Sequence, residues 1–474
     1  MNELVGRQPE KKILNEYIKS GKAEFIAIYG RRRVGKTFLI KQHFAHKFDF
    51  YMSGTIDAPK EVQFNNFREG LINAGMKNAP TLKNWQEAFF ILRQLLEPKA
   101  RRKKRCIIFL DEIPCLDTPK SGFIGALDHF WNSWAADQKS IMLIVCGSAT
   151  SWIINNIIDN HGGLHNRITH EMYLRQFTLG EVEKYLSVHN FDYDRFSICQ
   201  LYMAIGGVPY YLSLLDNKKS VVQNIDSLFF GKKAQLKTEY ERLFKSLFRN
   251  PETYMQVVDA LASAPNGLTR DEIAAKANMQ SGSRLTLILN DLENCDFIYH
   301  FRTRGKKIRA NQHIYQICDM FTMFYFKFCQ RETTDENYWT NNFKTPAATA
   351  WQGLAFERVC FLHINQITNA LGISKIHTEH YAWRSTTTEP KSQIDLAIER
   401  ADRMINICEL KFCDLPYIID KDEDMKLRLR MANFKAETAT KNGLLLTFIT
   451  PYGIASGKYS SQVKDVVELD ALFI

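Results

Sequence analysis

The chain has 474 residues, 45% apolar and 24% charged, which are the proportions of a globular protein and exclude a disordered, collagen-like or coiled-coil chain. It is too long for a single hydrophobic core, so we expect roughly two to four domains. Ten cysteines without a CxxC pair argue against a disulfide scaffold and against a zinc ribbon. No apolar run approaches the ~20 residues that span a bilayer, and the first residues lack the apolar core of a signal peptide. We therefore expect a soluble, cytoplasmic protein without a membrane partner.

The positive charge is unevenly distributed. The whole chain carries a formal net charge of +10, whereas residues 346–474 hold 15 basic and 16 acidic side chains, so that residues 1–345 carry +11. A basic body indicates a polyanionic partner such as double-stranded DNA. Solubility alone accounts for a charge of this size equally well.

Three short apolar runs alternate with helical, charged stretches in the first 215 or so residues. They read FIAIYG (25–30), IIFLDE (107–112) and IMLIVCGS (141–148). Continuous apolar runs of this length are typical of buried parallel strands, and helical connections between them predict an α/β sheet.

A glycine-rich motif follows the first run. Residues 30–37 read GRRRVGKT, which matches GxxxxGK[ST] with a strand before it and a helix-like segment after it. Such a loop points backbone N–H groups at phosphates, and the helix N-terminus adds partial positive charge. Lys36 is expected to bridge the β- and γ-phosphates of ATP, and the Thr37 hydroxyl to bind Mg²⁺. The predicted nucleotide contacts are Gly30, Arg31, Arg32, Arg33, Val34, Gly35, Lys36, Thr37 and Phe38.

Two carboxylates end the second run. Asp111 is expected to hold the Mg²⁺ shell, and Glu112 to orient and deprotonate the attacking water, an arrangement that suits hydrolysis. Ser148, at the end of the third run, stands where a side chain sensing the γ-phosphate would lie; a simple strand-end turn explains it equally well.

These motifs resemble, in chain order, those of the archaeal-type AAA+/STAND ATPases. The resemblance rests on Leu4-Val5-Gly6-Arg7, GRRRVGKT, the LDE strand, CGSAT, the arginine in LHNRIT and Gly206-Gly207-Val208-Pro209, and covers about the first 220 residues. It implies that Arg7 and Pro209 contact the adenine base. It also implies a sensing or trans-acting role for Arg167, although Asn166 stands where such chains commonly have glycine; an exposed surface arginine is the alternative.

The middle of the chain resembles a winged helix-turn-helix. A capped helix starts at Leu268, a second amphipathic helix spans 283–293, and two β-like runs follow (297–301 and 308–317). The wing between them, residues 302–309, has five basic side chains and no acid, which favours contact with DNA phosphates. A packing module beside the ATPase is the alternative. The aromatic run 320–329 is too short to span a bilayer, and we expect it to be buried.

The C-terminal region places acids and a lysine on two neighbouring strands. Asp395 lies in QIDLAI, and Glu409 and Lys411 in ICELKF; a short turn between the runs predicts a hairpin in which the two acids are close. Together with Glu357 on the preceding helix, which we expect over residues 348–367, they form a candidate Mg²⁺ or Mn²⁺ site, with Lys411 beside an attacking water. The layout resembles a PD-(D/E)XK nuclease-like domain of unknown function; Ile394 stands where that motif has proline.

The predicted protein is an α/β chain in four parts. These are a P-loop ATPase core with a parallel sheet (1–170), a helical lid (171–248), a winged helix-turn-helix (249–331) and a restriction-endonuclease-like α/β domain (346–474), with a polar linker at 332–346. The leading hypothesis is an ATP-hydrolysing, DNA-associated protein whose nucleotide state controls the C-terminal domain. The alternative is a STAND-type signalling or scaffold ATPase that binds a protein partner, or forms a homo-oligomer, with an inactive tail.

Overall fold

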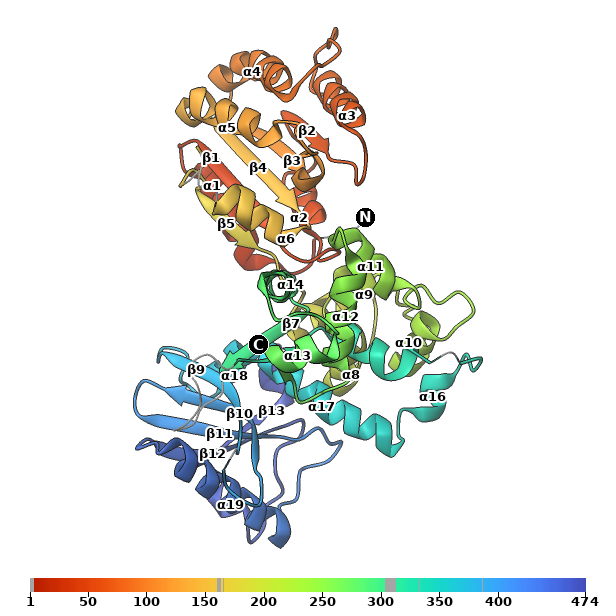
Figure 1. Cartoon of the computed structure of the whole chain (residues 1–474), viewed down its shortest axis with the longest axis vertical. Coiled ribbons are helices and arrows are strands. Elements are labelled where there is room, and N and C mark those ends of the chain that lie inside the picture. The colour runs from red at the N-terminus through yellow and green to blue at the C-terminus, as the bar shows by residue number, and fades with distance from the viewer. Residues whose placement is uncertain (1–3, 160–162, 165, 303–312, 332, 386) are drawn as a thin grey trace. The chain divides into compact units, whose positions relative to one another are not determined.

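The computed structural model describes residues 4–159, 163–164, 166–302, 313–331, 333–385 and 387–474 (Figure 1). The chain divides into two compact units. Unit 1 comprises Met1–Gln176 and Leu243–Pro251, and unit 2 comprises Phe177–Arg242 and Glu252–Ile474. The chain therefore passes between the units at three points. The predicted four-part division stays a prediction, but the structure assigns 243–251, expected to be lid and winged helix, to unit 1.

Unit 1 is built on a five-stranded sheet whose strands are all parallel, in the order β2-β3-β4-β1-β5. The strands are β1 (Glu24–Tyr29), β2 (Phe50–Ser53), β3 (Cys106–Asp111), β4 (Ile141–Gly147) and β5 (His170–Tyr173). Its helical segments are α1 (Gln8–Lys19), α2 (Lys36–His43), α3 (Lys60–Asn73), α4 (Trp85–Arg102), η1 (Ile113–Cys115), α5 (Phe123–Ser133), η2 (Ala135–Asp137), α6 (Thr150–Ile153) and η3 (Ile154–Ile158). The predicted parallel α/β sheet is confirmed.

Helices cover both faces of this sheet, which explains why its strands are apolar throughout. In β1, Phe25 and Ala27 pack with residues of α3, α4 and α5, whereas Ile26 and Ile28 pack with residues of α1 and α2. Successive side chains of a strand point to opposite faces, so a strand buried on both faces shows no alternation of polar and apolar residues.

Unit 2 begins with short helices and continues into a buried aromatic segment. Its helical segments are α7 (Leu179–Val188), α8 (Arg195–Ile205), α9 (Pro209–Leu212), α10 (Val221–Phe229), α11 (Glu239–Leu247, shared with unit 1), α12 (Pro251–Ala262), α13 (Arg270–Lys276), α14 (Ser283–Asn294), α15 (Met320–Phe324), η4 (Tyr325–Cys329), α16 (Tyr338–Asn342), α17 (Pro346–Leu362), α18 (Ile364–Ala370), α19 (Lys421–Thr438), η5 (Ser460–Gln462) and η6 (Leu469–Phe473). The predicted burial of the run 320–329 is confirmed: Phe324 lies against Phe229, Trp339 and Trp351, with ring centroids 4.6–5.4 Å apart.

Two expectations for this region need correction. The segment 332–346 is not simply a linker, because it contains α16, whose Trp339 is buried. Asp226 of α10 caps α16 from a distance: its carboxylate accepts from the Trp339 and Thr340 backbone N–H groups at 2.7 and 3.0 Å. The single helix expected over 348–367 is two helices, α17 and α18, which meet at His363.

Two further sheets belong to unit 2. A three-stranded sheet has the order β6-β8-β7, with β6 (Leu268–Thr269), β7 (Ile298–Arg302) and β8 (His313–Ile317). Strands β7 and β8 follow α12, α13 and α14 in the order expected for a helix-turn-helix with a hairpin, but residues 303–309 of the predicted wing lie outside the described residues. A five-stranded mixed sheet has the order β13-β12-β11-β10-β9, with β9 (Thr378–Arg384), β10 (Gln393–Arg400), β11 (Met404–Leu410), β12 (Gly443–Thr450) and β13 (Asp465–Glu468). Among the described residues, no helix is both long and apolar enough to cross a membrane.

Candidate active site

The phosphate-binding loop joins β1 to α2 and curls around its own lysine. Gly35 directly precedes α2 and has φ 91°. This left-handed conformation is one that residues other than glycine rarely adopt. Lys36 is 5% exposed, and its Nζ donates to the carbonyl oxygens of Gly30 and Arg31 at 2.8 and 2.9 Å. A cation held inside a loop at a helix N-terminus fits a polyphosphate ligand.

Gly30 has a second, structural reason to be glycine. A Cβ atom at this position, where φ is 139°, would lie 2.4 Å from the carbonyl oxygen of Leu174. The Leu174 N–H donates to the carbonyl of Tyr29 at 2.8 Å, so the loop begins in close backbone contact with the segment that follows β5.

The residues predicted to hold Mg²⁺ are in contact. Thr37 Oγ1 lies 3.1 Å from Asp111 Oδ1, which also accepts from the Glu112 backbone N–H at 3.1 Å. Burial and the neighbouring Glu112 carboxylate raise the pKa of Asp111, while its hydrogen bond with Thr37 opposes that rise. A buried carboxylate beside a hydroxyl is the oxygen-rich, electron-donating set that Mg²⁺ prefers, so these residues fit the ion that an ATPase uses.

Strand β4 lies between the strand that precedes the phosphate-binding loop and the strand that ends in the acids. Its end brings Ser148 to Glu112: the Ser148 N–H and Oγ donate to Glu112 Oε2 at 3.1 and 2.9 Å. Glu112 itself has φ 47° and ψ 47°, a left-handed conformation that sets the direction of its side chain. Ser148 is therefore in direct contact with Glu112, and its role as a sensor of the γ-phosphate stays a prediction.

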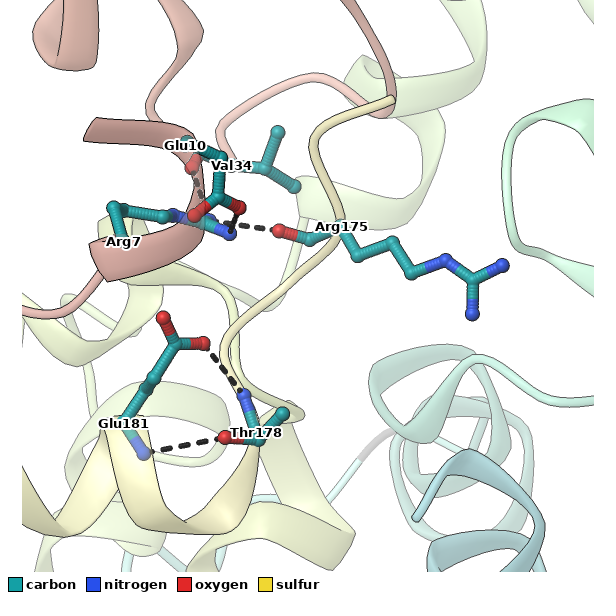
Figure 2. Close-up of polar contacts among 6 residues, drawn as sticks. All are labelled: Arg7, Glu10, Val34, Arg175, Thr178 and Glu181. Carbon is teal, nitrogen blue, oxygen red and sulfur yellow. Dashed lines mark hydrogen bonds and ion pairs between the residues drawn. The ribbon is translucent and has the colours of Figure 1, made fainter. Parts of the chain in front are cut away.

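Arg7 is buried, 4% exposed, and its guanidinium is bound to backbone (Figure 2). Its Nη2 donates to the carbonyl oxygens of Val34, in the phosphate-binding loop, and of Arg175 at 3.0 and 2.7 Å. Its Nη1 lies 3.5 Å from Glu10 Oε1. These contacts occupy the side chain that the resemblance assigned to adenine, and the base contact stays a prediction.

The other predicted nucleotide residues are distributed around the loop or outside it. Arg31 and Val34 are buried, whereas Arg32, Arg33, Thr37 and Phe38 are half-buried. Arg167 is exposed in the stretch before β5, and Pro209 is the first residue of α9 in unit 2. The roles assigned to these two residues stay predictions.

The predicted C-terminal hairpin is present. Leu396 of β10 pairs with Cys408 of β11, so Asp395 and Glu409 follow at the next position of the antiparallel ladder. Lys411 Nζ lies 2.9 Å from Glu409 Oε1, which confirms that these two side chains share a face. Burial, followed by the Asp395 carboxylate, raises the pKa of Glu357.

Two of these carboxylates lie beside cations of the chain, and the third accepts a hydrogen bond from an amide. Glu409, 4% exposed, pairs with Arg430 of α19 as well as with Lys411. Glu357 Oε2 lies 3.5 Å from Arg358 Nη1, and Asp395 Oδ1 accepts from Gln393 at 3.0 Å. Within the part of the chain that the structure describes, no group of three or more His, Cys, Asp or Glu side chains is placed to hold a metal ion. The predicted Asp395–Glu409–Glu357 metal set therefore stays a prediction.

Sequence reasoning missed Arg430 and the backbone carbonyls that Arg7 binds. Arg430 lies in a strongly charged helix with no motif of its own, and it reaches Glu409 only because α19 packs on the sheet. A buried-looking acid such as Glu409 does signal that a cationic partner exists, but not which residue supplies it.

Comparison with known proteins agrees with the geometry of unit 1. Residues 4–215 match the family described as an ATPase domain predominantly from Archaea. The chain is 24% identical over 434 residues to the uncharacterized protein MJECL04 of Methanocaldococcus jannaschii, covering 89% of each chain. A Walker-type ATPase of Pyrococcus abyssi has 19% identity and a TM-score of 0.49, covering 69% of this chain and 96% of that one. The ORC2 protein of Aeropyrum pernix, solved in ADPNP–ADP complexes, has 12% identity and a TM-score of 0.41, covering 68% and 93%. Residues 4–215, with their phosphate-binding loop and paired acids, are thus similar to an ATPase domain found predominantly in Archaea, and the protein is an ATP-hydrolysing enzyme.

Proposed function

We propose that the protein is a DNA-associated ATPase of the AAA+ type, in which the nucleotide state of unit 1 controls the nuclease-like C-terminal domain of unit 2. The observation that carries the catalytic part is the double contact of the acids: Asp111 is bound by Thr37 of the phosphate-binding loop, and Glu112 by Ser148, which directly follows β4. Asp111 thus lies beside Thr37 at the expected metal position, whereas Glu112 is oriented by Ser148.

The residues then divide the work of hydrolysis among themselves. Lys36 places its charge against the β- and γ-phosphates, and Thr37 with Asp111 would hold Mg²⁺, which supplies charge neutralisation on the phosphate oxygens. Glu112 orients the attacking water and accepts its proton. Ser148 donates two hydrogen bonds to Glu112 Oε2, which hold the carboxylate in one orientation.

Support for DNA association comes from α14, the second helix of the winged-helix arrangement. Four of its five buried residues are apolar, the fifth being Asp291, whereas Ser283, Arg284 and Asn290 are exposed together with Leu287. A mainly polar helix face followed in the sequence by a basic run has the chemistry for a groove and its flanking phosphates. The test is ATP hydrolysis measured with and without double-stranded DNA at two salt concentrations. We expect DNA to stimulate ATP hydrolysis at low salt and to do so less at high salt. If DNA neither binds to the protein nor changes its hydrolysis rate at low salt, the association is contradicted.

A second candidate function is favoured by Arg430. Its ion pair with Glu409, together with Lys411, places two protein cations on the acid that a nuclease needs for metal. An internal guanidinium in that place supports a STAND-type scaffold ATPase with a catalytically inactive tail that binds a protein partner.

Metal-dependent plasmid nicking separates the two candidates. An active domain should nick DNA with Mg²⁺ or Mn²⁺ in at least one nucleotide state, and Lys411→Ala should lose cleavage. An inactive tail should nick under no condition, and Mn²⁺ should leave its melting temperature unchanged. In that case Asp395→Asn should be neutral or stabilising, because the half-buried Asp395 carboxylate would be partly desolvated without a metal to compensate.

A further inference from the structure

The segment that leads out of the ATPase sheet is held by hydrogen bonds on both sides of Gln176, at Arg175 and at Phe177. β5 ends at Tyr173, and the chain enters unit 2 between Gln176 and Phe177. On the unit 1 side, the Arg175 carbonyl is held by Arg7 at 2.7 Å. We call residues 175–177 the exit segment.

The unit 2 side is anchored as firmly. The Phe177 N–H donates to the Gly207 carbonyl at 2.7 Å, and the Phe177 carbonyl accepts from Tyr202 Oη at 2.9 Å. A Cβ atom on Gly207 would lie 1.9 Å from the Phe177 carbonyl oxygen, so only glycine permits this approach. One residue further, Thr178 begins α7 with a capping box, in which its side chain and that of Glu181 satisfy each other's backbone N–H groups (Figure 2).

The unit 1 anchor is also part of the nucleotide site. The same Nη2 atom of Arg7 that holds Arg175 donates to Val34, two residues before Lys36. Gly30, at the other end of the loop, lies against Leu174, directly before the exit segment. The phosphate-binding loop is thus linked through the Arg7 side chain to Arg175 of the exit segment, and it contacts the backbone of Leu174 directly before that segment.

We propose that Arg7 is a positioning residue that ties the phosphate-binding loop to the exit segment, so that ATP in the loop restricts the connection into unit 2, while Gly207 holds the far end. The proposal deepens the proposed function and rests on it, because it names the route by which nucleotide state reaches unit 2. Displacement of the loop by a ligand moves the Val34 carbonyl, and a guanidinium shared between two carbonyls transmits that movement to Arg175. The other two crossings between the units lie within α11 and at the start of α12, where helical hydrogen bonds limit bending.

Hydrogen exchange in the peptide 174–182, with and without a non-hydrolysable ATP analogue, reads the exit segment directly. In the wild type we expect the analogue to slow exchange there. In Arg7→Ala the analogue should bind within about three-fold of wild-type affinity, because Lys36 and the loop remain, but the slowing should disappear. The hydrolysis rate kcat should fall roughly ten-fold or more with little change in KM, since the loop is misplaced rather than removed.

Matched variants keep the test sharp. Arg7→Lys should give a partial effect, because one ammonium cannot copy the guanidinium fork that serves two carbonyls. Lys11→Ala, on the same helix, removes a cation whose Nζ donates to the Leu4 carbonyl at 3.0 Å, and should leave exchange and kcat unchanged. If Arg7→Ala does not fold, Gly207→Ala tests the other anchor and should also abolish the analogue's effect on unit 2.

Three outcomes are decisive. Slowed exchange that persists in both Arg7→Ala and Gly207→Ala would overturn the proposal. A selective loss of ATP affinity in Arg7→Ala, with affinity for inorganic tripolyphosphate retained, would overturn it in favour of the base contact. A wild type whose unit 2 peptides ignore the analogue altogether would instead overturn nucleotide control itself, the function on which the proposal rests.

Discussion

Lys36 and Glu112 serve different steps, and single substitutions should separate them. Lys36→Ala removes the cation that faces the phosphates, so we expect nucleotide binding to be lost. Glu112→Gln keeps a group that can hold the water but cannot accept its proton, so binding should persist while hydrolysis falls roughly 10²–10⁴-fold. Nucleotide titration and phosphate release measure the two effects, with exposed Lys47→Ala as the charge-matched control. Hydrolysis by Glu112→Gln at the wild-type rate would exclude Glu112 as the base.

His363 makes unit 2 sensitive to mild acid. Its Nε2 accepts from the Leu179 N–H at 2.9 Å, its Nδ1 bonds to the Val359 carbonyl at 2.8 Å, and the Tyr202 ring lies 5.4 Å away. Burial lowers the pKa of His363 to about 4. The unfolded chain, with an ordinary pKa near 6.5, therefore binds the proton first, and stability falls as the pH drops from about 6.5 towards 4.

Between pH 7.5 and 5, this linkage predicts a loss of about 2 kcal/mol for the unfolding of unit 2. Urea melts at the two pH values measure it. His363→Gln, which cannot titrate, should show a flatter pH dependence at lower overall stability, whereas exposed His377→Gln should retain the wild-type slope. An identical slope in wild type and His363→Gln would contradict the assignment.

At the scale of elements, α16 depends on a carboxylate from another helix. Asp226, 4% exposed, accepts from two N–H groups at the start of α16, and Thr340 Oγ1 lies 2.5 Å from its Oδ2. We expect Asp226→Ala to cost about 2–3 kcal/mol, because three donors lose a charged acceptor, and Asp226→Asn to cost about half as much. Asp216→Ala, which removes only a local turn contact with the Lys218 N–H, should stay within about 0.5 kcal/mol in the same denaturation series. Equal effects for Asp226 and Asp216 would refute the capping role.

The same element shows what the sequence could and could not predict. The runs 25–30, 107–112 and 141–148 were predictable because a strand buried on both faces is a continuous apolar run, which is visible in the local sequence alone. The α16 helix was not, because its acceptor lies 113 positions earlier in the chain. Strands β2 and β5 have four residues each, too few for a periodic signal.

The candidate sites follow the same rule. The phosphate-binding loop and the LDE strand are local motifs whose contacts, Thr37 with Asp111 and Ser148 with Glu112, follow from parallel strands ending at one edge. The C-terminal register was predictable from the turn length. The partner of Glu409 was not, because Arg430 arrives from a helix whose packing no local pattern specifies.

At the scale of the whole molecule, the basic wing offers a test of DNA association. Neutralising Arg302, Arg304 and Lys306 should weaken binding to double-stranded DNA and flatten the plot of log affinity against log salt. Each lost phosphate contact changes the slope by roughly 0.9. Neutralising Lys441, Lys458 and Lys464, exposed lysines of the C-terminal sheet region, removes the same charge and should leave the slope nearly unchanged. Equal slopes in both triple variants would favour a packing role for the wing.

The contact of η6 with α7 has a consequence for synthesis on the ribosome. A Cβ atom on Gly180, the second residue of α7, would lie 2.2 Å from the Phe473 carbonyl oxygen, and the Leu179 N–H depends on His363. Most residues of unit 1 lie in one early stretch of the chain. In contrast, Phe473, which contacts α7, lies about 290 residues downstream of that helix. At roughly 5–20 residues per second, synthesis of these intervening residues takes roughly 15–60 seconds. During this interval the nascent chain leaves exposed the backbone of α7 at Gly180 that Phe473 later covers.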